Sequence, residues 1–146
     1  MENTIFGNNS QTADTRRTPS FLDMMRSSFE RAQAPVQQIQ EIDVIQLSEK
    51  IKSNSGNILD VRTPGEFAQG HLDNSFHLSL QELSAFGQQA AEKMPFGKED
   101  EIFIICRSGN RSAAAANILS SLGYTNVYNV RGGIMAWVQN GLQITN

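Results

Sequence analysis

The sequence has few of the residues that build disulfide frameworks or metal sites. It contains one cysteine and two histidines in 146 residues. A single cysteine excludes an intramolecular disulfide, and no cluster of cysteines and histidines has the spacing of a metal site. The chain is therefore expected to hold no metal. A free cysteine is typical of a reducing compartment, so the predicted location is cytoplasmic.

Long apolar runs and charge of a single sign are absent as well. No hydrophobic stretch approaches the ~20 residues that span a bilayer, and the polar N-terminus lacks the apolar centre of a signal peptide. The 12 basic and 15 acidic side chains give a net charge of -3 and are mixed along the chain. Without a basic stripe, nucleic acid is not an expected partner. The length suits one domain with a substantial core.

The first 35 residues differ in composition from the rest. Residues 1–17 are rich in Asn, Thr, Ser and Gln and have hardly a hydrophobe, which predicts a disordered tail. Thr18 and Pro19 then suit the cap and first residue of an amphipathic helix, which with its linker fills residues 18–35. Its apolar face over residues 18–34 is expected to dock on this domain, on a second copy or on a protein partner. The alternative of a membrane surface fits poorly, because the polar face has mixed charge.

Strand and helix signals alternate from residue 36 to the end, so residues 36–146 are predicted to be one domain. The predicted strands cover residues 36–42, 57–61, 75–78, 102–105 and 127–130. The predicted helices run from the Asp43 cap to about Ile51, briefly from Pro64, over residues 81–94, through the alanine-rich stretch to Leu122, and over residues 134–138. Leu83, Phe86, Ala90 and Met94 are expected to face inward. This alternation predicts an α/β fold with a mostly parallel sheet between two helical layers.

The only cysteine stands where an apolar strand meets a polar loop. Residues 102–105 read Ile-Phe-Ile-Ile, a pattern typical of a buried central strand. Cys106 follows directly, and the alanine-rich helix begins a few residues later. Ligands bind at this edge of open α/β sheets. Loop N–H groups, the positive end of the helix, Arg107 and Arg111 would all favour a thiolate.

The loop itself carries further expectations. Gly109 is predicted to avoid a collision between a Cβ and the loop backbone or a bound anion. Asn110 or Ser112 is predicted to cap the following helix. Arg111 is expected either to attract an anionic substrate or to be held in a structural ion pair.

Three motifs in order resemble the single-domain rhodanese sulfurtransferases. Cys106-Arg107-Ser108-Gly109-Asn110-Arg111-Ser112 resembles their active-site loop. Asp60-Val61-Arg62-Thr63-Pro64-Gly65-Glu66-Phe67 continuing to Gly70-His71-Leu72 resembles an upstream signature, and Gly132-Gly133-Ile134-Met135-Ala136-Trp137 a closing one. The resemblance covers about residues 39–142. It implies a five-stranded rhodanese-like sheet with Cys106 after the fourth strand, and chemistry that needs no cofactor.

The resemblance also implies a role for each matched residue. Cys106 would be the catalytic nucleophile, and Arg107, Ser108, Gly109, Asn110, Arg111 and Ser112 would bind the substrate. Asp60, Arg62, Glu66 and His71 are expected to be structural supports beneath the loop rather than substrate contacts. His77 is expected to be structural and Trp137 to lie in the core.

The implied reaction is transfer of a sulfane sulfur through a Cys106 persulfide. The donor would be thiosulfate or a low-molecular-weight persulfide, and the acceptor a thiol or cyanide. The acid at position 66 makes the thiosulfate dianion the weaker candidate. The alternatives are a sulfur carrier or redox sensor without turnover, and a cysteine phosphatase or arsenate reductase. Those last enzymes have five residues between cysteine and arginine, whereas four separate Cys106 from Arg111.

Overall fold

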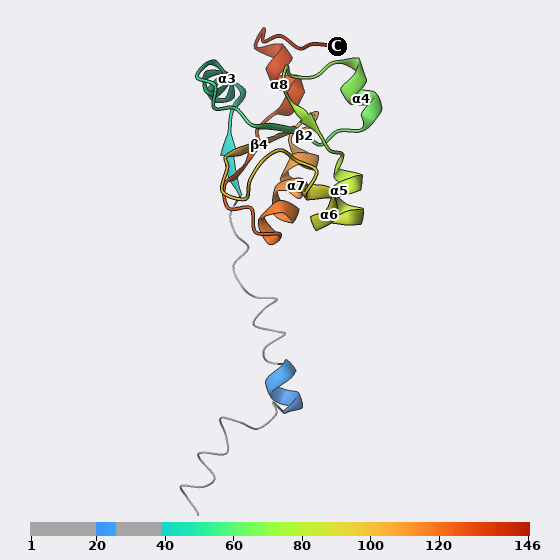
Figure 1. The fold of residues 1–146 in the computed structure, drawn as a ribbon. Coiled ribbons are helices and arrows are strands. Elements are labelled where there is room, and N and C mark those ends of the chain that lie inside the picture. The colour runs from blue at the N-terminus through green and yellow to red at the C-terminus, as the bar shows by residue number, and fades with distance from the viewer. Residues whose placement is uncertain (1–19, 26–38) are drawn as a thin grey trace, which may run out of the picture. The chain divides into compact units, whose positions relative to one another are not determined.

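The computed structural model describes residues 20–25 and 39–146. The chain divides into two units, Met1–Val36 and Gln37–Asn146. In the first unit, residues 21–25 are helical (Figure 1). Ser20 Oγ accepts the Asp23 N–H at 3.1 Å, and Asp23 Oδ2 accepts the Ser20 N–H at 3.2 Å. Ser20 therefore caps the described helical turn, whereas the predicted cap Thr18 and first helical residue Pro19 lie outside the described residues. The predicted tail, residues 26–35 of the helix and linker, and residues 36–38 of the first strand lie outside the described ranges.

Five parallel strands form the sheet of the second unit. They are β1 (Gln40–Ile42), β2 (Ile58–Asp60), β3 (Phe76–His77), β4 (Ile102–Ile105) and β5 (Val127–Val130), in the order β1-β5-β4-β2-β3. Every pairing is parallel, so the predicted three-layer α/β fold with a five-stranded sheet is confirmed. All four residues of β4 are buried, as expected for the central strand of a sheet covered on both faces.

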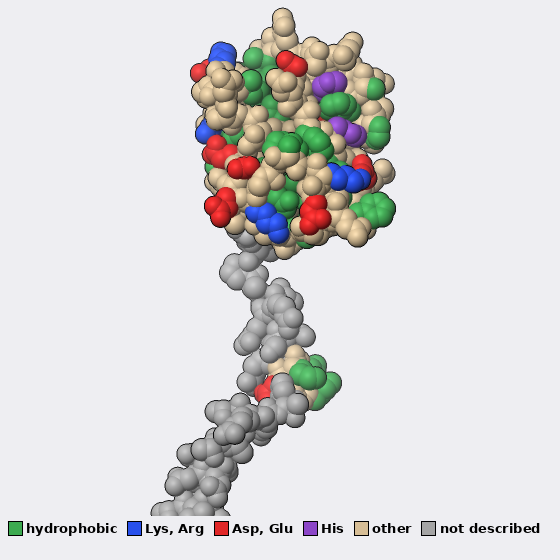
Figure 2. Space-filling model, viewed as in Figure 1, with side chains coloured by type: hydrophobic (Ala, Val, Ile, Leu, Met, Phe, Trp, Pro, Cys, Tyr) green, Lys and Arg blue, Asp and Glu red, His purple; other side chains and the backbone are tan. Residues whose placement is uncertain are grey.

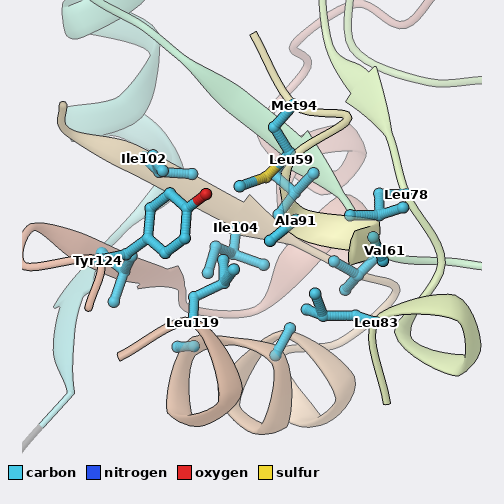
Figure 3. Packing of buried hydrophobic residues seen from close by; sticks show 14 of the residues in the cluster. Leu59, Val61, Leu78, Leu83, Ala91, Met94, Ile102, Ile104, Leu119 and Tyr124 are labelled. Carbon is cyan, nitrogen blue, oxygen red and sulfur yellow. The ribbon is translucent and has the colours of Figure 1, made fainter. Parts of the chain in front are cut away.

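Helices cover both faces of this sheet. α3 (Val44–Lys52) and α8 (Gly133–Gln139) lie over one face, and α5 (Leu80–Phe86), α6 (Gln88–Ala91) and α7 (Asn110–Ser121) over the other (Figure 1). Alternate residues of β4 supply the two cores: Ile102 and Ile104 pack toward α7, and Phe103 and Ile105 toward α3 and α8. Figure 3 shows the first of these cores, in which Leu119 of α7 and Leu83 of α5 meet the sheet.

The single helix predicted over residues 81–94 is wrong. Two short helices, α5 and α6, meet at Gly87, whose φ of +50° lies in a region that side-chain-bearing residues seldom adopt. The break turns the apolar stripe, so Leu83, Ala90 and Met94 are buried while Phe86 is 59% exposed. The expectation that Phe86 faces inward is therefore wrong as well.

Helix starts follow local side-chain chemistry. Asp43 Oδ1 accepts the Gln46 N–H at 2.7 Å, and Gln46 Oε1 accepts the Asp43 N–H at 3.0 Å. The predicted cap of α3 is therefore confirmed. α4 (Pro64–Gln69) begins at Pro64 as predicted and is capped by Thr63. Both caps involve residues three apart, which makes them readable from the sequence.

Membrane-spanning helices and clusters of metal ligands are absent from the described residues. No helix within residues 20–25 and 39–146 is long and apolar enough to cross a membrane. In the same ranges no three His, Cys, Asp or Glu side chains gather as metal ligands. On the face shown in Figure 2, basic and acidic side chains are interspersed over the second unit.

Candidate active site

The loop that follows β4 turns directly into α7. Cys106 comes after the last strand residue, and α7 begins at Asn110. Gly109 occupies the cap position in a left-handed conformation with φ of +110°, and no side chain caps the helix. The predicted cap by Asn110 or Ser112 is therefore wrong, since Asn110 is already helical and the Ser112 hydroxyl bonds elsewhere. A Cβ at Gly109 would lie 3.4 Å from the Gly132 nitrogen, an ordinary contact. Its positive φ, not the predicted collision, is the reason for glycine.

The thiol of Cys106 is enclosed by this loop. The residue is 1% exposed, and its Sγ accepts the Gly109 N–H at 3.0 Å. Ser112 Oγ lies 3.4 Å from the same sulfur. Burial opposes ionisation, but hydrogen bonds that the thiolate can accept from the Ser112 hydroxyl and from the N–H groups of Ser112, Gly109 and Ser108 outweigh it. The pKa of Cys106 is lowered as a result.

The two loop arginines have different surroundings. Arg111 donates to Glu66 of α4 through Nη1 and Nη2, at 2.6 and 2.9 Å. The hydrogen bond from Arg111 lowers the pKa of Glu66 to about 2, and Glu66 raises that of Arg111. The Arg107 side chain is exposed and makes no hydrogen bond or ion pair within the described part of the chain. Of the two expectations for Arg111, the ion pair is what the structure contains; Arg107 is the unpaired cation.

A buried ion pair lies at the end of β2, beside β4. Arg62 donates from Nε and Nη2 to Asp60 at 2.8–3.1 Å, and its Nη2 also donates to the Gly70 carbonyl at 2.7 Å. Asp60 is 0% and Arg62 5% exposed. The two opposite charges therefore lie against each other within this scaffold. Glu66, expected to share it, pairs with Arg111 instead.

The histidines contact backbone and one aromatic ring. His71 Nδ1 lies 2.7 Å from the Phe67 carbonyl oxygen, and His77 Nε2 lies 2.7 Å from that of Arg62. Both rings pack on the ring of Phe67 between them, with centroid distances of 3.7 and 4.7 Å. These contacts support structural roles for both residues. Trp137 lies in the core at 6% exposed.

The Gly132-Gly133 pair places the N-terminus of α8 against the loop that follows β4. The N–H groups of Ile134 and Met135 donate to the carbonyl oxygens of Cys106 and Arg107, at 2.8 and 3.0 Å. A Cβ on Gly133 would lie 2.6 Å from the Arg107 carbonyl, so only glycine allows this approach. The carbonyl groups of Cys106 and Arg107 thus point to α8, and N–H groups of the loop point to the sulfur. Sequence reasoning matched this motif without identifying its purpose.

Asn129 of β5 is the site residue that sequence reasoning missed. Its Oδ1 accepts the Ser112 hydroxyl at 2.5 Å, and the residue is 5% exposed. A buried asparagine in a strand is a signal, because polar side chains are seldom buried without a partner. The partner could not be named without the strand order.

A cavity of about 440 Å³ opens beside the loop. Arg107, Met135 and Val138 are among the residues that line it, together with Glu66 and Gln69 of α4. It combines apolar walls with the unpaired Arg107 guanidinium. A small anion with an apolar portion would suit this lining.

Comparison with known proteins identifies the fold family. Residues 43–140 match the family described as rhodanese-like domain. The chain belongs to the rhodanese-like family. A sulfurtransferase of Allochromatium vinosum is 36% identical to this protein over 107 residues, which are 73% of this chain and 94% of the relative. The thiosulfate sulfurtransferase GlpE of Tolumonas auensis is 32% identical over 100 residues, 68% of this chain and 89% of the relative.

Solved structures agree with this assignment of the fold. A rhodanese-related protein from Thermoplasma volcanium superposes with a TM-score of 0.62 at 34% identity, covering 73% of this chain and 97% of that one. A Rhodopseudomonas palustris protein of unknown function, described as a possible tyrosine phosphatase, gives 0.64 at 28% identity and covers 73% and 85%. The rhodanese-like fold is thus shared by proteins to which different reactions are attributed.

Proposed function

We propose that this member of the rhodanese-like family is a sulfurtransferase that carries sulfur on Cys106. The observation that carries the proposal is the setting of the thiol: buried at the end of β4, with the Gly109 N–H on its sulfur and a lowered pKa. A thiolate held in this way is a nucleophile, and a sulfur atom added to it would meet the same N–H donors. The sulfurtransferase names of its relatives agree with this chemistry.

The reaction is a double displacement in which sulfur passes through the enzyme. The Cys106 thiolate attacks the outer sulfur of the donor, and the donor's S–S bond breaks. The leaving group takes that electron pair as sulfite when thiosulfate is the donor, or as a thiolate when a persulfide is. The new persulfide carries its charge on the terminal sulfur, where the loop N–H groups stabilise it. A thiolate or cyanide then attacks that sulfur and releases Cys106 as a thiolate.

Donor selection is assigned to Arg107. Arg111 is occupied by Glu66, so Arg107 is the loop cation free to attract an anion, and it borders the 440 Å³ cavity. Thiosulfate and a low-molecular-weight persulfide both carry negative charge. Glu66, the acid that disfavours the thiosulfate dianion, is paired with Arg111, and the name of the Tolumonas relative favours thiosulfate. The thiol or cyanide acceptor would enter after the first product leaves. A cytoplasmic location belongs to the same proposal, because a persulfide carrier needs reduced thiols around it.

Intact mass spectrometry tests the proposal directly. After incubation with thiosulfate, or separately with glutathione persulfide, the protein should gain the mass of one sulfur atom. Cys106→Ser should gain none and should form no thiocyanate from cyanide. Turnover that survives in the serine variant would exclude the mechanism. An adduct that forms without turnover would favour the sulfur-carrier alternative, and reversible oxidation without any adduct would favour the redox sensor.

The phosphatase alternative is tested by loop length. A cradle with four residues between Cys106 and Arg111 suits a single sulfur atom, whereas a phosphoryl group brings three equatorial oxygens that need donors. We expect the protein to transfer sulfur and to leave an aryl phosphate intact. Inserting one glycine after Gly109 should reduce sulfur transfer by loosening the cradle. Efficient hydrolysis of the aryl phosphate by the unmodified loop would contradict the proposed function.

A further inference from the structure

A chain of side-chain contacts leads from the thiol to the surface. Cys106 Sγ lies 3.4 Å from Ser112 Oγ, whose hydroxyl donates to Asn129 Oδ1 at 2.5 Å. Asn129 Nδ2 then donates to Glu41 Oε2 at 3.3 Å. Glu41 and Asn129 are register partners on β1 and β5, so strand pairing brings their side chains together. The chain thus connects a buried sulfur to a carboxylate whose side chain is 47% exposed.

The chemistry of these groups fixes which atom donates in each hydrogen bond of the series. A carboxylate offers only acceptors, so Asn129 must turn its NH₂ group toward Glu41. The amide oxygen of Asn129 then faces Ser112, and a carbonyl oxygen can only accept. The single hydrogen of the Ser112 hydroxyl is therefore committed to Asn129. The thiol of Cys106 is left facing a lone pair, which can accept its S–H but cannot donate to a thiolate.

Burial strengthens the hydrogen bond from the Ser112 hydroxyl to Asn129. Ser112 is 0% and Asn129 5% exposed, and hydrogen bonds in such surroundings are stronger than in water. If the Ser112 hydrogen turned to the sulfur, Asn129 Oδ1 would lose its donor inside the protein. The Gly109 N–H remains on the sulfur in either case. Of the Gly109 N–H and the Ser112 hydroxyl, the two groups whose distances to the sulfur are given above, the hydroxyl is the one with a competing acceptor among the described residues.

We propose that Glu41 and Asn129 are positioning residues that hold the Ser112 hydroxyl hydrogen away from Cys106 until the thiol ionises. On ionisation the S–H proton leaves to solvent base. The Ser112 hydroxyl then rotates its hydrogen from Asn129 Oδ1 to the charged sulfur, and no other covalent bond changes. This inference rests on Cys106 being the reacting group of the proposed function. It concerns how readily that group ionises.

Other charged groups lie near both ends of this series of contacts, at Cys106 and at Glu41. Near the sulfur, Arg111 is paired with Glu66 and Arg62 with Asp60, while Arg107 is exposed. At the surface, Arg131 Nη1 lies 3.3 Å from Glu41 and its Nη2 lies 3.9 Å from Asp43. Asp43 thus shares Arg131 with Glu41, and no hydrogen bond joins it to Asn129. It is a matched control for the charge of Glu41.

The experiment measures the alkylation rate of Cys106 by iodoacetamide from pH 5 to pH 10 in Glu41→Gln and Asp43→Asn. Each variant removes one negative charge at Arg131, and asparagine still caps α3. Only Glu41→Gln offers an NH₂ group that lets the Asn129 amide turn over and free the Ser112 hydrogen. A hydrogen bond to a charged group corresponds to about one pH unit. Glu41→Gln should therefore react roughly three- to tenfold faster below the wild-type pKa, and Asp43→Asn no more than about twofold faster.

A second background separates hydrogen-bond direction from charge. Asn129→Ala removes the competing acceptor, so it should lower the apparent pKa of Cys106 by itself and make Glu41→Gln no more effective than Asp43→Asn. Equal shifts in Glu41→Gln and Asp43→Asn in the wild-type background would overturn the proposal. So would a Glu41→Gln effect that persists in Asn129→Ala. Alkylation needs no sulfur donor, so failure of sulfur transfer would leave this test standing. If Asn129→Ala does not fold, the comparison of the two surface variants still decides.

Discussion

Gly133→Ala would test how α8 holds the active-site loop. Gly133 has a φ of +58°, and an added Cβ would lie 2.6 Å from the carbonyl carbon and oxygen of Arg107. Because these are backbone atoms, they cannot move aside as the end of a flexible side chain could. The helix would have to withdraw, and the hydrogen bonds from Ile134 and Met135 to the loop carbonyls would lengthen or break.

The magnitude follows from two contributions. A left-handed conformation costs a residue with a side chain about 1–2 kcal/mol. Loss of two partly buried backbone hydrogen bonds adds about 1 kcal/mol each. We therefore expect Gly133→Ala to lower the free energy of unfolding by roughly 3–4 kcal/mol. The freed loop carbonyls should also loosen the N–H cradle, so the pKa of Cys106 should rise and its alkylation at neutral pH should slow.

Gly141 provides the matched control. Its φ is +76°, but a Cβ there would meet no atom within 4 Å. Gly141→Ala should therefore show the conformational cost alone, about 1–2 kcal/mol, with normal Cys106 reactivity. Urea unfolding gives both free energies, and iodoacetamide kinetics in the folded protein give the reactivity. If Gly133→Ala were no less stable than Gly141→Ala, or kept a wild-type alkylation profile, the docking of α8 would not be what shapes the loop.

Three further predictions concern charges around the thiol. Because Arg111 lowers the pKa of Glu66 to about 2, the pair should add stability above the unfolded value of about 4.3 and lose it as pH falls toward 2. Urea unfolding should then show Glu66→Gln less stable than wild type by about 1–2 kcal/mol at pH 7, after solvent screening, with the gap closing near pH 2; a constant gap would contradict this. The wild-type thiol should titrate in alkylation below the ordinary value of about 8.5, and a normal midpoint would mean that the cradle is not formed. Arg107→Ala should raise the KM for thiosulfate several-fold and leave the urea midpoint unchanged, whereas an unchanged KM would remove Arg107 from donor binding.

Features that depend on neighbours in the sequence were predictable. The strands over residues 102–105 and 127–130 and the Asp43 cap were all read correctly, because each rests on side chains a few residues apart. The break at Gly87 was missed for a related reason. The apolar spacing of residues 81–94 continues through the glycine, and periodicity carries no information on a backbone that adopts a positive φ.

The position of the candidate nucleophile was also predictable from neighbouring residues. Cys106, its flanking arginines and the following helix are contiguous, so the sequence alone placed a thiol at the end of a central strand with a helix N-terminus after it. The family resemblance supplied the candidate chemistry. What contiguity could not supply was the partner of each loop side chain, because those partners lie elsewhere along the chain.

The tertiary structure decided those partners through the order of the strands. Placing β2 beside β4 brings α4 to the loop, so Glu66 reaches Arg111 across 45 residues. Of the two loop arginines, Arg107 is then the one without an ion pair among the described residues. Placing β5 between β4 and β1 puts Asn129 against Ser112 and Glu41 against Asn129. The sequence by itself determined which residue can become a thiolate. Only the packing of distant strands determined which groups compete for the hydrogen that stabilises it, because a hydrogen bond forms between neighbours in space.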